Sequence, residues 1–356
     1  MAKQLAITFL PLLVLLLLLF TSTTEMVEGS KKTYGVYDNN KSVKLFVFGD
    51  SYVDTGNFLD SPSYRPPYGM TYPGKPAGRF SDGRVLSDYI ASFLKIETPI
   101  PYSLKNSSNL QYGINFAHGG VGIFETLTKG PNMTVQIDSL ENLIKQNVYT
   151  KQDLESSVAL VAVSGNDYTA FLAKNKSIIE IKSFTETLIK QISINVQRIH
   201  NLGVNKIAIG LLEPIGCLPQ ITVVTFHLSC VDPLNLVAQN HNEVLLQTVK
   251  QLNQQVGKSV FVTLDLYNAF LSTIEMMQEN QEDDSKLLNP LLKPCCNGEG
   301  FKNSCGVVDD NGEKRYSLCD EPEASFFWDY VHPSQNGWNS VYQQLQSSLG
   351  QLIEKS

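Results

Sequence analysis

Short apolar runs rich in β-branched residues recur along the chain, and segments with helical periodicity separate them. Strands that lie between two layers of helices are apolar on both faces, which is the character of these runs. They predict strands over residues 44–48, 113–117, 157–163, 206–212 and 259–266. Strands that alternate with helices indicate an α/β protein with a parallel sheet, here in one large domain of residues 31–356.

Apolar residues spaced three or four apart predict the helices that connect these strands. One such series runs from 184 to 199, and its helix is expected to stop at Gly203. A second helix is predicted over 232–256, because an Asp-Pro pair favours a helix start. Further helices are expected over about 85–94 and from Gly337 onward.

The segment 61–84, "SPSYRPPYGMTYPGKPAGRFSDGR", interrupts this alternation. It is rich in proline, tyrosine and glycine and has no periodicity, which predicts a long loop. Loops of this length often carry function. Its aromatic residues suit either a wall that faces a substrate or a surface loop that packs on its own tyrosines.

The N-terminus reads "MAKQLAITFLPLLVLLLLLF" and continues with small and polar residues. A lysine followed by an apolar run is typical of a secretory signal peptide, with cleavage expected between Phe20 and Ser30. A membrane anchor is the alternative, but spanning needs about 20 apolar residues, and this run contains Pro11 and precedes no basic cluster. We therefore expect no stable membrane span and exclude residues 1–30 from the folded domain.

Composition narrows the possible functions. Apolar residues make up 42% of the chain and charged residues 18%, which is typical of a globular protein. The formal net charge is -7, and no basic stripe with interleaved aromatic residues is present. This pattern argues against nucleic acid as a partner.

The cysteines and glycosylation motifs also suit a secreted protein. The chain has six cysteines, and an even number in an oxidising route predicts disulfides. Cys217 and Cys230 would close a short loop, and the other four would cross-link the segment 294–320; a zinc site is the alternative, but the spacing fits no familiar ligand pattern. Four Asn-X-Ser/Thr motifs are candidate glycosylation sites: Asn40, Asn106, Asn132 and Asn175.

Polar motifs follow three of the predicted strands: "GDS" after 44–48, "HGG" after 113–117 and "SGND" after 157–163. Ligands bind outside the carboxyl ends of the strands in open parallel sheets, so these motifs are expected to converge. A fourth motif, "DYVHP" at 329–333, precedes the last predicted helix.

Together these motifs contain the groups that a serine hydrolase needs. Ser51 would be the nucleophile, His332 the general base, and Asp329 the residue that orients the imidazole. The backbone N–H groups of Ser51 and Gly120 and the side-chain amide of Asn166 would bind the negative charge that develops on the substrate. The GxSxG, HExxH and Walker A motifs of other catalysts are absent from the sequence.

Each residue also has a purely structural interpretation. Ser51 could cap a following helix, and Gly120 could serve a tight turn. Asn166 could be a turn or capping residue, and Asp329 with His332 could form a surface pair. These interpretations do not explain why all the motifs fall at one edge of one sheet.

Four segments, "FGDSYVDTGN", "INFAHGG", "GND" and "FWDYVHPS", resemble in order and spacing the four blocks of the plant-type GDSL esterase/lipase family of SGNH hydrolases. The resemblance extends from Lys44 to the final helix. It implies a three-layer α/β/α, flavodoxin-like fold with a five-stranded parallel sheet, hydrolysis of carboxylic esters, and no cofactor or metal. It also implies the same roles for the five site residues named above.

Two positions depart from the family pattern: Tyr52 stands where leucine gives the family its name, and Ser164 stands where glycine is commoner. Neither change removes a catalytic atom, so both bear on substrate preference. An acyltransferase with the same residues and a catalytically weak secreted binding protein are the alternative functions. The ester itself could be a small molecule, a lipid or an acylated glycan.

Overall fold

The computed structural model describes residues 43–106, 109–163, 165–174, 178–281, 290–300 and 304–354. The expected signal peptide lies outside the described residues, as do Asn40, Ser164 and Asn175. The described residues all belong to one unit, Val36–Ser356.

A five-stranded parallel sheet forms the centre of this unit, with the strand order β2-β1-β3-β4-β5. Its strands are β1 (Leu45–Gly49), β2 (Gly113–Asn115), β3 (Val158–Ala162), β4 (Lys206–Gly210) and β5 (Phe261–Leu264). Every strand residue except Lys206 and Thr263 is buried. This burial on both faces is the reason the five strands were recognisable in the sequence.

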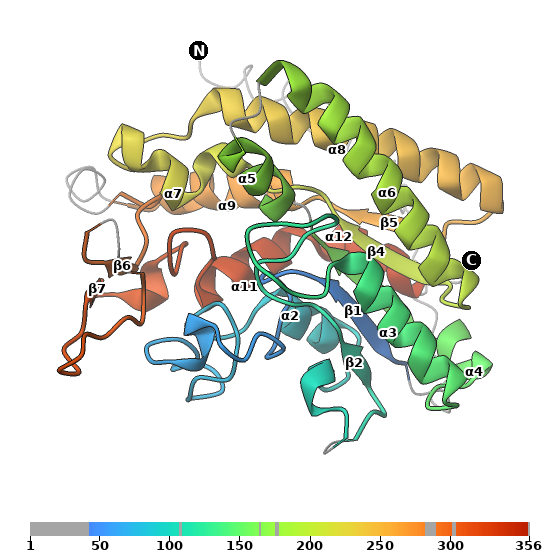
Figure 1. Ribbon diagram of the computed structural model, residues 1–356. Helices are drawn as coiled ribbons and strands as arrows, with labels where there is room; N and C mark the ends of the chain where they lie inside the picture. Colours follow the sequence, from blue (N-terminus) through green and yellow to red (C-terminus); the bar gives the residue numbers. More distant parts are fainter. Residues whose placement is uncertain are drawn as a thin grey trace, which may run out of the picture. The chain divides into compact units, whose positions relative to one another are not determined.

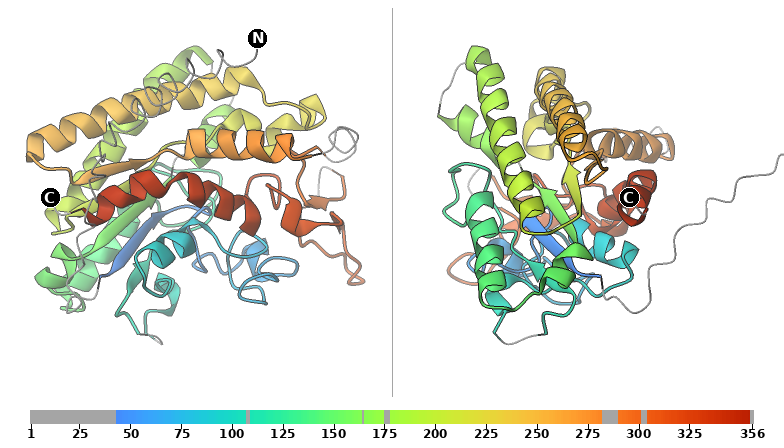
Figure 2. Two further views of the ribbon diagram at one scale, coloured as in Figure 1. Left: turned by 180° about the vertical axis from the view of Figure 1, so that it is seen from behind. Right: turned by 90° about the vertical axis from the view of Figure 1, so that its right-hand side faces the viewer.

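Helices cover both faces of the sheet, which gives the expected three-layer α/β/α, flavodoxin-like arrangement (Figures 1 and 2). On one face lie α3 (Met133–Lys145), α6 (Ile181–Asn201) and α8 (Asp232–Val256). On the other lie α2 (Leu86–Phe93), α9 (Leu266–Glu279), α11 (Gln335–Gln344) and α12 (Gln346–Ile353). Shorter helices are α4 (Lys151–Glu155), α5 (Gly165–Ala173) and α7 (Pro219–Thr222).

The predicted helices over 184–199, 232–256 and 85–94 are confirmed as α6, α8 and α2. The last predicted helix begins two residues early, at Gln335, where the Ser334 hydroxyl accepts a hydrogen bond from the Gly337 N–H. The helices α3 and α9 were not predicted from the sequence. Both have side-chain caps that mark a helix start, Asn132 for α3 and Asp265 for α9.

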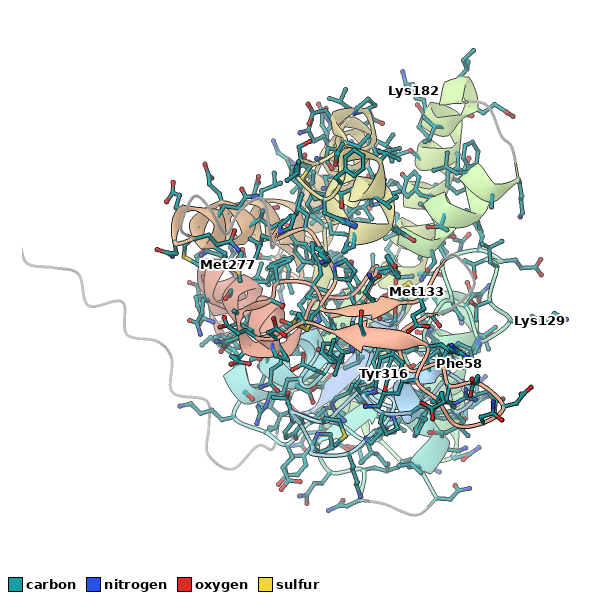
Figure 3. The ribbon with its side chains drawn as sticks, turned by 90° about the vertical axis from the view of Figure 1, so that its left-hand side faces the viewer. Phe58, Lys129, Met133, Lys182, Met277 and Tyr316 are labelled. Atoms are coloured by element: carbon teal, nitrogen blue, oxygen red, sulfur yellow. A yellow bond between two sulfur atoms is a disulfide. The ribbon has the colours of Figure 1, made fainter. Side chains whose placement is uncertain are left out.

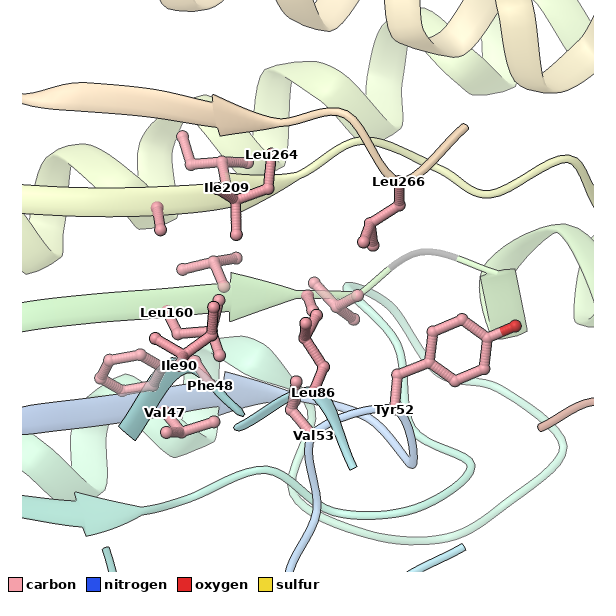
Figure 4. Close-up of a cluster of buried hydrophobic side chains, with 14 of the residues drawn as sticks. Val47, Phe48, Tyr52, Val53, Leu86, Ile90, Leu160, Ile209, Leu264 and Leu266 are labelled. Carbon is pink, nitrogen blue, oxygen red and sulfur yellow. The ribbon is translucent and has the colours of Figure 1, made fainter. Parts of the chain in front are cut away.

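The core lies between the sheet and the helices. Figure 4 shows Val47, Leu160 and Ile209 from three neighbouring strands, with Leu86 and Ile90 of α2 packed over them. In Figure 3, Lys129 and Lys182 point away from the protein, whereas the side chain of Met133 is fully buried.

All six cysteines form disulfides. The predicted bond between Cys217 and Cys230 is confirmed, and the zinc alternative is wrong because no cysteine is left to bind a metal. The other two bonds, Cys295–Cys319 and Cys296–Cys305, cross-link the region of a small antiparallel hairpin, β6 (Cys296–Gly298) and β7 (Tyr316–Leu318). Within the described ranges, no helix is long and apolar enough to cross a membrane.

Candidate active site

The loop after β1 places Ser51 at the carboxyl edge of the sheet. Gly49 approaches β3 so closely that a Cβ there would lie 2.0 Å from the carbonyl oxygen of Ala162, and its φ of +148° favours glycine. The chain then makes one turn, in which the N–H of Asp54 donates to the carbonyl of Asp50 at 3.0 Å. The interpretation of Ser51 as a helix cap is wrong, because residues 51–53 form a turn and the next helical segment begins only at Pro62.

The turn ends because the Asp54 side chain redirects the backbone. Its carboxylate accepts hydrogen bonds from the N–H groups of Gly56 at 2.8 Å and Asn57 at 2.7 Å. The other carboxylate oxygen accepts from the N–H of Gly119 at 2.9 Å. Asp54 therefore connects the loop after β1 to the loop after β2.

Ser51, His332 and Asp329 form one hydrogen-bonded chain. The Ser51 Oγ lies 2.8 Å from the Nε2 of His332, and the His332 Nδ1 lies 2.8 Å from both carboxylate oxygens of Asp329. Ser51 and Asp329 are buried, and the His332 side chain is 12% exposed. A nucleophile, a base and an orienting acid are thus within hydrogen-bonding distance of one another.

Asp329 is held in its ionised form. Burial by itself would raise the pKa of this carboxyl, but the nearby His332, the Val331 N–H and the Tyr68 hydroxyl outweigh burial and hold the pKa below its ordinary value. The hydrogen bonds from the Val331 N–H at 2.9 Å and the His332 N–H at 2.9 Å also fix its orientation.

Tyr68 is a site residue that the sequence motifs do not indicate. It comes from the 61–84 loop, and its hydroxyl donates to the Oδ2 of Asp329 at 2.7 Å. Burial, and then the neighbouring Asp329, raise the pKa of Tyr68 well above its ordinary value, so the hydroxyl remains a donor. The loop therefore packs a tyrosine against the site, and the only signal in the sequence was its unusual aromatic content.

Two of the candidate oxyanion donors lie on the loops after β1 and β2, and Asn166 lies in the first turn of α5, which follows β3. In the part of the chain that the structure describes, the N–H groups of Ser51 and Gly120 have no hydrogen-bond acceptor. Gly120 has a φ of +77°, and a Cβ there would lie 2.3 Å from the Oγ1 of Thr128, so both backbone and space require glycine. Asn166 lines the same cavity as Ser51, and its Nδ2 donates to the carbonyl of Val121 at 3.0 Å.

Asp167, the neighbour of Asn166, ties the loop after β2 in place. Its carboxylate accepts from the N–H groups of Ile123 and Phe124, each at 2.9 Å. Burial raises the pKa of Asp167 to about 6 in spite of these hydrogen bonds. Asp54 thus holds the loop after β2 at Gly119, before Gly120, and Asp167 holds it at Ile123 and Phe124, after Gly120.

A cavity of about 130 Å³ opens beside Ser51 at the ends of β1, β3 and β4. Most of its lining is apolar, and Asn166, Tyr52 and Glu213 are among its polar residues. Tyr52, which stands where the family has leucine, makes two contacts. Its ring packs against Trp338 at 5.1 Å between centroids, and its hydroxyl donates to the carbonyl of Val331 at 3.1 Å. It therefore links the nucleophile loop to the His332 loop.

The histidine of the HGG motif and two of the candidate glycosylation sites do not line this cavity. His118 stacks on Phe58 at 4.6 Å and does not line the cavity. Asn106 is exposed, and the Asn132 Oδ1 accepts a hydrogen bond from the N–H of Val135 at 3.2 Å. Glycosylation of these two residues stays a prediction. Among the described residues, no group of histidine, cysteine or carboxylate side chains is arranged to hold a metal ion.

Comparison with known proteins identifies the family. The model of the GDSL-like lipase/acylhydrolase family matches residues 45–345, most of the chain. The chain belongs to this family. It is 47% identical to the GDSL esterase/lipase At5g03610 of Arabidopsis thaliana over 336 residues, which cover 93% of each protein. It is 45% identical to the GDSL esterase/lipase At3g09930 of the same plant over 350 residues, with 96% of this chain and 98% of that protein covered.

As a member of the GDSL-like lipase/acylhydrolase family, the protein is a hydrolase of carboxylic esters. The four sequence blocks that suggested this family are the segments that carry the loops described above. Their hydrogen bonds explain why the blocks contain Asp54 and Asp167 in addition to the candidate catalytic groups.

Proposed function

We propose that this protein is a secreted serine esterase in which Ser51, His332 and Asp329 are the catalytic residues. The observation that carries the proposal is the hydrogen-bonded chain from the Ser51 Oγ through His332 to Asp329, with each link at 2.8 Å. The base already contacts the nucleophile, so His332 needs no rearrangement before it removes the Ser51 proton.

In the first half of the reaction, the Nε2 of His332 removes the Ser51 proton as Oγ attacks the ester carbonyl. The N–H groups of Ser51 and Gly120 and the Asn166 amide stabilise the oxyanion. The tetrahedral intermediate collapses when His332 returns the proton to the leaving alcohol, which leaves an acyl-enzyme on Ser51. Asn166 exchanges its hydrogen bond to Val121 for one to the oxyanion in this scheme.

In the second half, His332 removes a proton from water, and the hydroxide attacks the acyl carbonyl. The carboxylic acid then leaves as Ser51 regains its proton. Throughout, the ionised Asp329 stabilises the imidazolium form of His332.

We also propose secretion, with residues 1–30 as the signal segment and residues 31–356 as the mature domain. The three disulfides support this route, because such bonds persist in oxidising compartments and are rare in the cytosol. N-terminal sequencing of protein collected from the medium of expressing plant cells tests both the route and the cleavage site. Retention in the cells with residues 1–30 intact would contradict the proposal.

The catalytic assignment is tested with purified secreted protein and p-nitrophenyl acetate or butyrate. Ser51→Ala and His332→Ala should each lower kcat by roughly 10⁴ to 10⁶, and Asn166→Ala by about 10² to 10³. Ser183→Ala, at an exposed serine of α6, is the matched control and should retain the wild-type rate. A fluorophosphonate probe should label the wild type and not Ser51→Ala, and an undiminished rate in Ser51→Ala would refute the assignment.

A further inference from the structure

The cavity beside Ser51 combines an apolar lining with two buried carboxyl groups, Asp50 of the nucleophile loop and Glu213. Its apolar residues come from several elements and include Leu172, Leu212, Ile215, Leu218, Ile221 and Leu266. Glu213 follows β4 and is only 7% exposed. Its Oε1 lies so near the neighbour of Asn166 that a Cβ on Gly165 would be 3.0 Å from it. The Glu213 carboxyl group is therefore inside the cavity, on the side that carries Asn166.

Glu213 is not used in the proposed acyl transfer, and its surroundings offer few donors. In the described chain, the groups that favour its ionised form are its own backbone N–H, the Tyr52 hydroxyl and His332. Burial outweighs them and raises the pKa of Glu213 to about 7. Among the described residues that line the cavity none is basic, so none of them forms an ion pair with this carboxylate.

Tyr52 cannot fully satisfy Glu213. A phenol has one proton, and the Tyr52 hydroxyl donates it to the carbonyl of Val331 at 3.1 Å. Figure 4 shows this hydroxyl pointing away from the buried apolar side chains that surround the ring. Val331 and Glu213 thus compete for this one donor, so in the described chain the carboxylate only shares the Tyr52 hydroxyl, and an incompletely satisfied polar group is costly in such a site.

We propose that Glu213 and Tyr52 form a binding site for a hydroxyl group on an otherwise apolar part of the substrate. The inference rests on the proposed function, because it concerns the ester that Ser51 attacks. A hydroxyl matches both forms of the carboxyl: it donates to the carboxylate, and its oxygen accepts from the carboxylic acid. The apolar lining would contact the hydrocarbon part, so the preferred substrate is a hydroxylated aliphatic ester.

The hydroxyl could belong to the acyl part or to the alcohol part of the ester. The experiment therefore has two arms with chains of about six to eight carbons, a length chosen for a small apolar cavity. One arm compares ethyl esters of ω-hydroxy fatty acids with those of the unsubstituted acids. The other compares acetate esters of aliphatic diols with those of the matching simple alcohols. Release of acid is followed by titration, and kcat/KM is determined for each ester.

The wild type should prefer the hydroxylated ester about tenfold in one arm, which is the effect of one buried hydrogen bond. Glu213→Leu should abolish the preference, whereas Glu213→Gln, which still offers an acceptor and donors, should retain part of it. Glu243→Gln, at an exposed position of α8, is the control and should show the wild-type ratio. If Glu213→Leu does not fold, the ratio of kcat/KM between hydroxylated and unsubstituted esters in the wild type still tests the proposed hydroxyl site.

Ratios near one in both arms, with hydrolysis that depends on Ser51, would overturn the inference and leave the proposed function standing. A preference for a trimethylammonium ester over its hydroxylated counterpart would also overturn it. If no ester is hydrolysed, the proposed function fails, and calorimetric binding of a diol and the matching alcohol to Ser51→Ala decides the inference. Tighter binding of the diol, lost in Ser51→Ala with Glu213→Leu, would support it; equal binding would refute it.

Discussion

The buried carboxyl of Glu213 makes a quantitative prediction about stability. Burial raises its pKa from the ordinary value of 4.5 to about 7 in the folded protein. Between these values the folded state binds the proton more tightly than the unfolded state. The stabilising contribution is therefore complete below pH 4.5 and is lost as the pH rises through about 7.

The size of the effect follows from the two pKa values. A difference of one pKa unit corresponds to about 1.4 kcal/mol, so the complete loss is about 3 kcal/mol of unfolding free energy. Glu213→Gln keeps the shape of the side chain and removes the titration. Relative to the wild type, this variant should gain about 3 kcal/mol when the pH is raised from about 4.5 to about 8.5.

Urea unfolding with the disulfides oxidised measures this change for the wild type and the variant at each pH. The difference between the two proteins cancels the other titrating groups, and any constant effect of the amide drops out. Glu243→Gln, an exposed control, should parallel the wild type. If Glu213→Gln also parallels the wild type across this range, Glu213 ionises in the fold without penalty, and the reasoning about its surroundings is wrong.

Two further predictions concern the positioning of the site. Tyr68→Phe removes the 2.7 Å hydrogen bond to Asp329 and should lower kcat for p-nitrophenyl butyrate about tenfold. A change confined to KM would contradict a role for Tyr68 in positioning Asp329. Gly120→Ala should cost about 1 to 3 kcal/mol in urea unfolding and lower kcat, because a Cβ would lie 2.3 Å from Thr128. Gly312→Ala is the control, since Gly312 has a similar φ of +83° and open space around it. An equal loss of unfolding free energy in both variants would show that Thr128 moves away from the new Cβ without cost.

The strands and the candidate catalytic residues were accessible from the sequence for a common reason. Buried parallel strands are apolar throughout, so each polar motif that follows one marks a strand end. Ser51, Gly120 and Asn166 were found in this way. The helices α3 and α9 were missed, although Asn132 and Asp265 cap their first turns.

The residues that support the site could not be found by this route. Tyr68 lies in a loop without periodicity, and its contact with Asp329 joins positions 261 residues apart. Glu213 stands directly after an apolar run, where a turn or a surface position was equally consistent with its neighbours in sequence. Local patterns contain no information about which distant groups share a cavity.

The sequence by itself determined the layered α/β class, the family and the groups available for chemistry, because local periodicity and short motifs encode burial and turns. Only the tertiary structure decided that His332 contacts Ser51 across 281 residues and that the Val331 carbonyl and the Glu213 carboxyl share the Tyr52 hydroxyl. Distances and burial of this kind arise when the sheet brings loop ends together. They set the ionisation of Asp329 and Glu213, and with it the chemistry of the site.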